Sequence, residues 1–443
     1  MARTRTAEAN GTKELPSITS LSVEGFKSID KEQTIEIRPL TILAGANSSG
    51  KSSLMQPLLL LKQTLEATYD PGPLKIDGPN VAYTKVGQFL CKANAHGKVV
   101  NFVFGIGIGE QNNAKITFQS SDATPLEFAN IEIENTELHS KFVPGNYDMS
   151  ILFSDPELLA MMEKQYGENA GFKLTRSRFY LNTSFTFGGV PAEVSYDIPF
   201  QFGATRNAIS RVIHVPGLRG NPRRNYAVAS VGEIFPGLFE NYVASIILHY
   251  NANLKFATRL NTDLLELELT SRVEAVKIDD TQVDIQVGRL LKPAKHVEDD
   301  LVSIADVGFG VSQVLPVVVA LLVAKPGQLV YIEQPEIHLH PRSQHAMAKL
   351  IARAAIRGVK VVIETHSSIL LLGIQSLIAL GELDPKIVVL HWCQRDPKTG
   401  LTKVTSADLD EAGSFGDWPE DFDDVSLEAQ MRFLDAAEKK LSQ

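Results

Sequence analysis

One nine-residue stretch constrains the fold more than any other part of the chain. Residues 45–53 read Gly-Ala-Asn-Ser-Ser-Gly-Lys-Ser-Ser and fit the pattern G-x-x-x-x-G-K-[ST] at every position. The apolar run 40–44 before them is typical of a strand, and the run 54–65 after them is typical of a helix. A strand, a glycine-rich turn and a helix in this order predict a phosphate-binding loop. We therefore expect the chain to bind a nucleoside triphosphate.

The residue types in this loop suit a triphosphate. Small residues let the backbone fold closely around phosphates, so that amide groups and the positive end of the helix point at them. Lys51 is expected to reach the β- and γ-phosphates, and the Ser52 hydroxyl to take one coordination position of Mg²⁺. The predicted nucleotide-binding residues here are Gly45, Ala46, Asn47, Ser48, Ser49, Gly50, Lys51, Ser52 and Ser53.

Composition limits the partners. The 443 residues suffice for two or three domain-sized units, with 44% hydrophobic and 21% charged residues, as in ordinary globular proteins. The formal net charge of −9 argues against indiscriminate nucleic-acid binding, although it leaves room for a local basic patch.

Cys91 and Cys393 lack metal-type spacing and favour a reducing, cytoplasmic setting. The apolar run 314–324 is too short for a bilayer, so no membrane partner is expected.

A second group of candidate residues follows an apolar run late in the chain. Residues 328–332 are predicted to form a strand that ends in Glu333, Gln334 and, after a proline, Glu336. A carboxylate at a strand end beside a phosphate loop is what a further Mg²⁺ contact requires. Glu333 is the predicted residue for that contact.

Two more polar residues are candidates for the same site. His366 follows the apolar run 358–363, where it could donate a hydrogen bond to the γ-phosphate or orient the attacking water. Gln88 stands at a distance along the chain that allows it to return to the Mg²⁺, and a polar surface position is the alternative. The histidines 338, 340 and 345 are interpreted as structural, because no cysteine or carboxylate set completes a zinc site.

A glycine-containing segment before the acidic strand predicts a second anion-binding helix start. Residues 306–313 open the apolar helix expected at 314–323, and the candidate nucleotide contacts are Gly308, Phe309, Gly310 and Ser312. The two anion sites need not serve one phosphate within one molecule. If two chains pair head to tail, the loop of one and this helix start of the other enclose each nucleotide, and ATP then holds together a twofold dimer.

Other segments are less informative. Residues 213–226 form a loop with Arg219, Arg223 and Arg224, which suits either a phosphate-bearing ligand or partner, or a solvated loop. Residues 99–202 have mostly strand-type composition with one helix at 158–166, and 264–287 reads as two strands joined at residues 279–280.

Taken in order, these segments resemble a known family. The "GFKS" turn at 25–28, "GANSSGKSS", "DVGFGVSQVLP", "YIEQPEIHLHP" and "VVIETHSS" are similar to the ABC-type ATPase heads of the SMC, RecF and overcoming-lysogenization-defect group. More narrowly, the chain resembles stand-alone AAA-family ATPases of bacterial antiphage defence operons. The resemblance implies an α/β fold, an ABC-ATPase-like head with a mixed central sheet, an antiparallel β subdomain and an inserted, mostly β lobe.

The resemblance also implies roles and boundaries. Residues 45–53 match the Walker A motif, Glu333 the Walker B acid, residues 308–313 the signature and His366 the switch histidine. The expected divisions are a disordered tail 1–15, an N-terminal ATPase lobe 16–95, an inserted β-rich lobe 96–225, a C-terminal ATPase lobe 226–395 and an acidic segment 396–443.

Two departures from the family pattern bear on catalysis. Gln334 stands where these ATPases usually carry a catalytic glutamate, and an amide cannot take a proton from water. Hydrolysis should therefore be slow unless Glu336 substitutes. Gly308 replaces a serine that would meet the γ-phosphate, so this contact would depend on backbone amides or on Ser312.

Three functions remain open at this point. The leading hypothesis is a slow ATPase that forms a dimer or larger oligomer on ATP and controls a separately encoded effector, in antiphage defence. A RecF- or SMC-like DNA-repair ATPase is the alternative, and it would need a basic channel. An ATPase-nuclease is the third, and it would need a further metal-carboxylate domain. The acids between 408 and 424 are instead interpreted as a solvated face or a partner patch.

Overall fold

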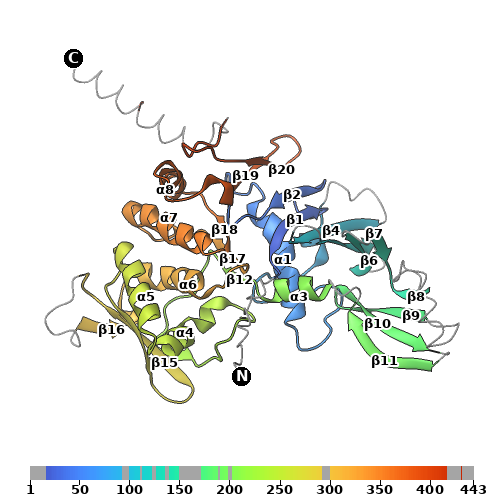
Figure 1. Cartoon of the computed structure of the whole chain (residues 1–443), viewed down its shortest axis with the longest axis horizontal. Coiled ribbons are helices and arrows are strands. Elements are labelled where there is room, and N and C mark those ends of the chain that lie inside the picture. Colours follow the sequence, from blue (N-terminus) through green and yellow to red (C-terminus); the bar gives the residue numbers. More distant parts are fainter. Residues whose placement is uncertain are drawn as a thin grey trace, which may run out of the picture.

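The computed structural model describes residues 16–91, 99–109, 112–121, 126–134, 139–148, 171–187, 190–197, 202–291, 300–416 and 431. The expected tail 1–15, the helix predicted at 158–166 and all the acidic residues beyond 416 lie outside these ranges. Figure 1 shows helices gathered on one side of a central sheet and antiparallel strands on the other.

The central sheet has six strands in the order β12-β17-β18-β3-β19-β20. The first five are parallel to one another, and β20 runs antiparallel at the edge. Their bounds are β12 Ile213–Val215, β17 Leu329–Glu333, β18 Lys360–Glu364, β3 Leu40–Ala44, β19 Val388–Arg395 and β20 Thr402–Ala407. Because parallel strands end at one edge of a sheet, the segments that follow β3, β17 and β18 meet there.

The central strands divide their side chains between two hydrophobic cores. In β3, the side chains of Leu40, Ile42 and Ala44 enter one core and that of Leu43 enters the other, which is the two-residue period of a strand buried on both faces. In β17, Val330 and Ile332 likewise face the first core, and Tyr331 the second.

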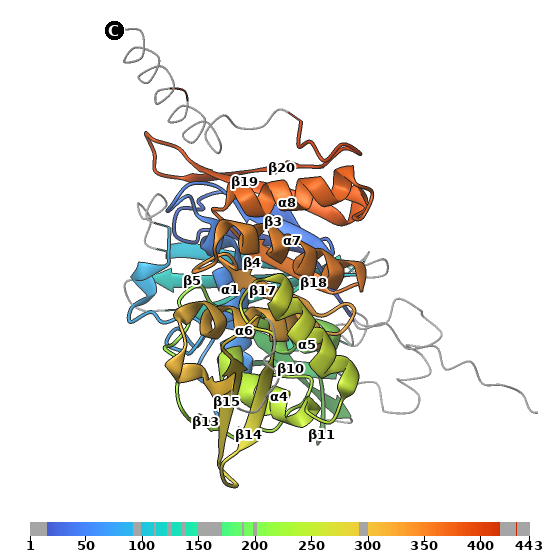
Figure 2. The same ribbon diagram turned by 90° about the vertical axis from the view of Figure 1, so that its left-hand side faces the viewer.

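Helices cover the first core, and Figures 1 and 2 both show α8, α7, α6 and α4 following one another across it. The helices of this face are α4 Val243–Tyr250, α5 Leu254–Glu266, α6 Phe309–Val323, α7 Pro341–Ile356 and α8 Ser368–Ala379. The second core is filled by α1, Lys51–Leu65, together with α3, Phe202–Ser210, and strands of the antiparallel sheet described next.

A six-stranded antiparallel sheet in the order β2-β1-β4-β5-β6-β7 packs against α1. Its strands are β1 Ile18–Glu24, β2 Gln33–Glu36, β4 Val99–Ile108, β5 Asn112–Ser121, β6 Glu127–Glu134 and β7 His139–Phe142. Since β4 pairs with β1, this sheet crosses the division predicted between residues 95 and 96. Strand β12, inside the predicted lobe 96–225, belongs to the central sheet, and its three residues are too few to show a period.

Two smaller antiparallel sheets complete the molecule. One has the order β11-β10-β9-β8, with β8 Gly145–Asp148, β9 Gly171–Ser177, β10 Tyr180–Phe187 and β11 Val190–Asp197. The other joins β13 Tyr226–Ala227, β14 Val273–Lys277, β15 Gln282–Gly288 and β16 Leu301–Ser303. The mixed central sheet with an antiparallel β subdomain confirms the predicted fold class.

The segment 264–287 differs in part from its prediction. The strand pair around residues 279–280 is present as β14 and β15, but residues 264–266 end helix α5. Leu260, Leu264 and Leu267 are buried at helical spacing, so the helix period applies up to this point. Within the described ranges, every helix is too short or too polar to cross a bilayer.

Candidate nucleotide-binding site

The predicted phosphate loop lies between β3 and α1, and its last glycine is fixed by its neighbours. Gly50 immediately precedes α1 with φ 101°, a left-handed conformation that disfavours other residues. A Cβ atom there would lie 2.3 Å from Thr402 Oγ1. The Thr402 hydroxyl donates to the Ser49 carbonyl oxygen (2.8 Å) and contacts the Ser28 hydroxyl (2.7 Å). Strand β20 therefore holds the loop from its outer side.

Lys51 is folded into the loop. Its Nζ donates to the carbonyl oxygens of Gly45 (3.0 Å) and Ala46 (2.8 Å), and its side chain is buried. Burial lowers the pKa of the amine, although the charge of Glu364 opposes the shift. The ammonium group is thus positioned at the mouth of the loop, where phosphate oxygens would be stronger partners than neutral carbonyls.

The loop opens into a cleft of about 840 Å³, which is within the range of cofactor pockets. The predicted residues that line it are Asn47, Ser48, Ser49, Gly50, Lys51, Ser52, Ser53, Gln88, Glu333, Gln334 and His366. The tertiary structure therefore brings both halves of the predicted site together. Residues that the sequence analysis did not select also line the cleft, among them Lys27, Gln56, Glu364, Arg395 and Thr399.

Glu364 is the most prominent of these additional residues. Its Oε2 accepts a hydrogen bond from the Ser52 hydroxyl (2.9 Å), and its Oε1 accepts one from Tyr331. Burial, and then the negative charge of Glu333, raise the pKa of the Glu364 carboxyl to about 7. The sequence signal was a charged residue directly after the apolar residues 361–363, two positions before His366.

Glu333 lies beside Glu364, because the two residues are register partners at the ends of β17 and β18. Glu333 Oε1 lies 3.2 Å from His214 Nε2, and its Oε2 accepts from the Gly217 amide (3.0 Å). Burial raises the pKa of Glu333, but the hydrogen bond from His214 and the Gly217 amide outweigh it, so the net pKa is lowered. The carboxylate is therefore kept ionised beside the cleft.

His214 was not predicted as a site residue. It is buried, its ring stacks on Tyr331 with centroids 5.2 Å apart, and its Nδ1 lies 3.1 Å from Asn80 Oδ1. Because it stands between two apolar residues in the short strand β12, its sequence neighbours mark it as a core position.

Glu336 and His366 are joined by a hydrogen bond. Glu336 Oε1 accepts from the Thr365 hydroxyl (2.8 Å) and from the His366 amide (2.9 Å), whereas its Oε2 has no hydrogen-bond partner among the described residues. Burial raises the pKa of Glu336. Glu336 lies outside the cleft lining, beneath the backbone that carries His366. Burial and the charge of Lys51 lower the pKa of the half-buried His366 ring, which favours its neutral form.

The two glutamines occupy different surroundings. Gln88 is exposed, and its Oε1 accepts from the amides of Thr84 (2.8 Å) and Lys85 (3.2 Å), so its carbonyl is already used in a local turn. Gln334 has a positive φ of 47°, and its backbone N–H group donates to the backbone carbonyl oxygen of Glu364 (2.8 Å).

The second predicted helix start faces solvent. Helix α6 begins at Phe309, whose side chain is 55% exposed, and no heavy atom lies within 4 Å of a Cβ built on Gly308. The Ser312 hydroxyl donates to the Phe309 carbonyl oxygen (2.9 Å). None of Gly308, Phe309, Gly310 and Ser312 lines the cleft that holds the phosphate loop.

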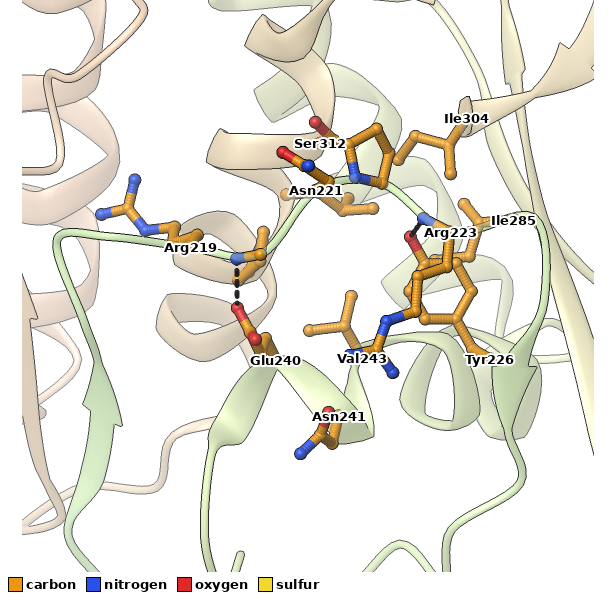
Figure 3. Close-up of a pocket in the computed structure, with 14 residues that line it drawn as sticks. Arg219, Asn221, Arg223, Tyr226, Glu240, Asn241, Val243, Ile285, Ile304 and Ser312 are labelled. Carbon is orange, nitrogen blue, oxygen red and sulfur yellow. Dashed lines mark hydrogen bonds between the residues drawn. The ribbon is translucent and has the colours of Figure 1, made fainter. Parts of the chain in front are cut away.

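The arginine loop separates into a buried and an exposed part. Arg219 is 5% exposed and lies outside the cleft lining, whereas Arg224 is exposed and pairs with Asp306 (2.6 Å). Figure 3 shows the small pocket beside this loop, about 50 Å³, where the Arg223 amide donates to the Tyr226 hydroxyl. A cavity of this size cannot hold a nucleotide.

Two family models match the chain. Residues 17–164 match the model described as "AAA ATPase domain", and residues 279–372 match "AAA domain, putative AbiEii toxin, Type IV TA system". Two segments of the chain are thus similar to AAA-type ATPase domains. The first match contains the phosphate loop, and the second contains the α6 start, Glu333, Gln334, Glu336 and His366. The resemblance to an ATPase head is thereby confirmed, although neither match spans half of the chain.

Solved structures give a more distant likeness. A structure titled as the SMC head bound to the C-winged helix domain of ScpA is 13% identical, covers 90% of this chain and 99% of that chain, and has a TM-score of 0.44. The SMC head from Thermotoga maritima is 10% identical, with coverages of 89% and 100% and a TM-score of 0.39.

A third is the SMC head with an extended coiled coil, bound to the C-terminal domain of ScpA derived from Pyrococcus furiosus. It is 11% identical, with coverages of 96% and 100% and a TM-score of 0.42. No curated protein matches the chain.

Proposed function

We propose that the chain is an ATP-binding, slowly hydrolysing ATPase that dimerises around ATP and controls a separate effector. The observation that carries this proposal is the composition of the cleft. Lys51 and Ser52 of the phosphate loop share it with Glu333 and His366, while an amide, Gln334, stands at the usual place of a catalytic carboxylate. This set of residues can bind a triphosphate but lacks a strong base in the position next to Glu333.

The residues around Ser52 fit a magnesium ion. A hydroxyl in direct contact with a buried carboxylate, with a second carboxylate on the neighbouring strand, is a set of hard oxygen donors of the kind Mg²⁺ prefers. Ser52, Glu333 and Glu364 would hold the ion. Gln88 is a weaker candidate, because its carbonyl oxygen already accepts two backbone hydrogen bonds. When bound, Mg²⁺ neutralises charge that develops on the phosphates.

The remaining side chains set the expected rate. His366, kept neutral by burial, can donate to the γ-phosphate or orient water. Gln334 can orient water but cannot accept its proton. Glu336 Oε1 accepts from Thr365 and from the His366 amide, and Glu336 lies outside the cleft lining, so this residue supports His366 instead of replacing the missing base. Slow hydrolysis follows, and a long-lived ATP state suits a protein that changes partners.

Dimerisation and effector control extend this proposal. The exposed start of α6 has free amide groups at its positive end, and these suit a phosphate held by a second copy in a head-to-tail pair. The chain's resemblance to ATPases of antiphage operons supports a role in that defence, with a separately encoded effector.

The test compares the unmodified protein with Gln334→Glu and Gln334→Ala. We expect ATP binding in all three, and single-turnover hydrolysis at least roughly tenfold faster in Gln334→Glu, because a carboxylate can take the proton. Sedimentation with and without ATP measures dimerisation. A turnover of about 10 s⁻¹ or more that is unchanged in Gln334→Ala would contradict the proposal.

A further inference from the structure

The loop after β12 contacts the acid end of β17 and helix α6 at the same time. The Gly217 amide donates to Glu333 Oε2 (3.0 Å), and Arg219 Nη2 donates to the main-chain oxygens of Glu333 (2.8 Å) and Gln334 (3.3 Å). The other terminal nitrogen of Arg219, Nη1, donates to the main-chain oxygen of Gln313 (3.1 Å) in α6. One guanidinium group therefore joins the turn at Gln334 to helix α6.

The surroundings of Arg219 fix it in this position. In Figure 3 its side chain points away from the other labelled residues, and it is 5% exposed. Burial lowers the pKa of Arg219 to about 10, opposed by the charges of Glu336 and Glu333, so the group remains protonated at neutral pH. The side chain of Gln313 also contacts the loop, because its Nε2 donates to the carbonyl oxygen of Gly220, the residue after Arg219 (3.0 Å).

The two elements that Arg219 joins are α6, which lacks one of its own hydrogen bonds, and the turn at Gln334, which has a strained backbone. In α6, Pro316 lacks the N–H group that would bond to the Ser312 carbonyl oxygen, so an external donor to the next carbonyl supports this part of the helix. At the other end, Gln334 has φ 47°, a conformation that persists only when its surroundings enforce it. A displacement of α6 would therefore move the backbone at Gln334, because the planar guanidinium group of Arg219 is hydrogen-bonded to both elements.

We propose that Arg219 is a positioning residue that couples the start of α6 to the Glu333–Gln334 turn. This inference rests on the proposed function, in which α6 meets the nucleotide of a partner copy while the turn faces the nucleotide of its own chain. Contact at Ser312 then adjusts Glu333 and Gln334 through Arg219, and each site of the dimer responds to occupancy of the other.

The experiment uses Arg219→Met, which keeps an apolar stem, and Arg219→Lys, which keeps the charge but loses the fork. Affinity for a fluorescent ATP analogue and single-turnover hydrolysis of bound ATP are measured separately. We expect affinity within about threefold of the unmodified protein, because Arg219 is outside the cleft, and hydrolysis at least about tenfold slower in both variants.

The matched control is Arg357→Met. Arg357 donates to the carbonyl oxygen of Leu321 near the other end of α6, so its loss removes a comparable contact without touching the turn. We expect hydrolysis per bound ATP to stay within about twofold of the unmodified protein, whatever the loss in melting temperature.

A double-mutant cycle tests the coupling itself. Ser312→Ala should slow hydrolysis in the unmodified protein and have no further effect in Arg219→Met, since the connection is already broken. Additive effects, equal effects of Arg219→Met and Arg357→Met, or ATP binding without measurable hydrolysis would overturn the coupling. An unmodified protein that binds no ATP would instead overturn the proposed function.

Discussion

The two helix starts that the sequence marks as anion sites have opposite surroundings. The start of α1 is enclosed, because Gly50 lies against Thr402 and Lys51 is buried within the loop. The start of α6 is open, with no atom near Gly308 and with Phe309 more than half exposed. Both have unpaired amide groups at the positive end of a helix.

The difference shows what a single chain can and cannot supply. The α1 start has a complete set of partners around one cleft, including two carboxylates and a histidine. The α6 start has the helix dipole, but none of its candidate residues lines the cleft that holds the phosphate loop. An enclosed site is intolerant of substitution and binds ligand by itself, whereas an open one tolerates substitution and matters only when something from outside meets it.

The largest effect is expected at the enclosed site from Lys51→Ala. Removing the ammonium takes away the only side-chain cation of the loop itself, so ATP affinity should fall by about 100-fold or more, roughly 3 kcal/mol. Calorimetric titration with ATP measures this. Folding should be retained, as checked by circular dichroism, and unchanged affinity in the folded variant would remove the basis of the site assignment.

The next largest effect concerns the backbone of the same loop. In Gly50→Ala, a methyl group would meet the Thr402 hydroxyl and the positive φ would be strained, so we expect a loss of about 2–3 kcal/mol in unfolding free energy. Denaturant unfolding followed by fluorescence measures it. Thr402→Ala in the Gly50→Ala background should restore part of the loss, and no restoration would show that the contact is not the cause.

A pH-dependent effect is expected from the acid that contacts Ser52. The folded-state pKa of Glu364 is raised to about 7, so the folded chain binds more protons than the unfolded chain between pH 4.5 and 7, and stability falls as pH rises through this window. Glu364→Gln removes that loss. Unfolding free energies measured in EDTA should favour the variant by roughly 3 kcal/mol at pH 8 and by little at pH 5. A benefit that is equal at both pH values would contradict this.

The smallest effect on stability is expected at the open site. Gly308 has φ −61° and free space where a methyl group would lie. In Gly308→Ala the unfolding free energy should therefore change by less than about 0.5 kcal/mol. ATP affinity of the single chain should also be unchanged, because Gly308 is outside the cleft. Sedimentation should nevertheless show weaker ATP-dependent dimerisation. A variant that dimerises normally would argue that α6 does not meet the nucleotide.

Much of the site was predictable from the sequence because its parts follow strands. The loop at 45–53 and Glu333 stand directly after an apolar run and His366 stands three positions past one, and the parallel order of β3, β18 and β17 brings these ends to one edge. Glu364 was missed because a charged residue at the end of a strand looks like an ordinary edge position. His214 was missed because β12 has only three residues and shows no period, whereas Arg219 was noted only as one arginine of a loop whose contacts no local pattern reveals.

Residue types and their spacing set the local chemistry: a strand, a glycine turn and a helix that suit phosphate, an acid followed by an amide, and a second helix start with small residues. Such patterns depend on residues only a few positions apart. Which carboxylate meets Ser52, and the contact of Arg219 with both α6 and Gln334, depend on how distant segments pack. Those contacts span 312 and 94–115 positions, and strand order and burial, which no local pattern contains, set them.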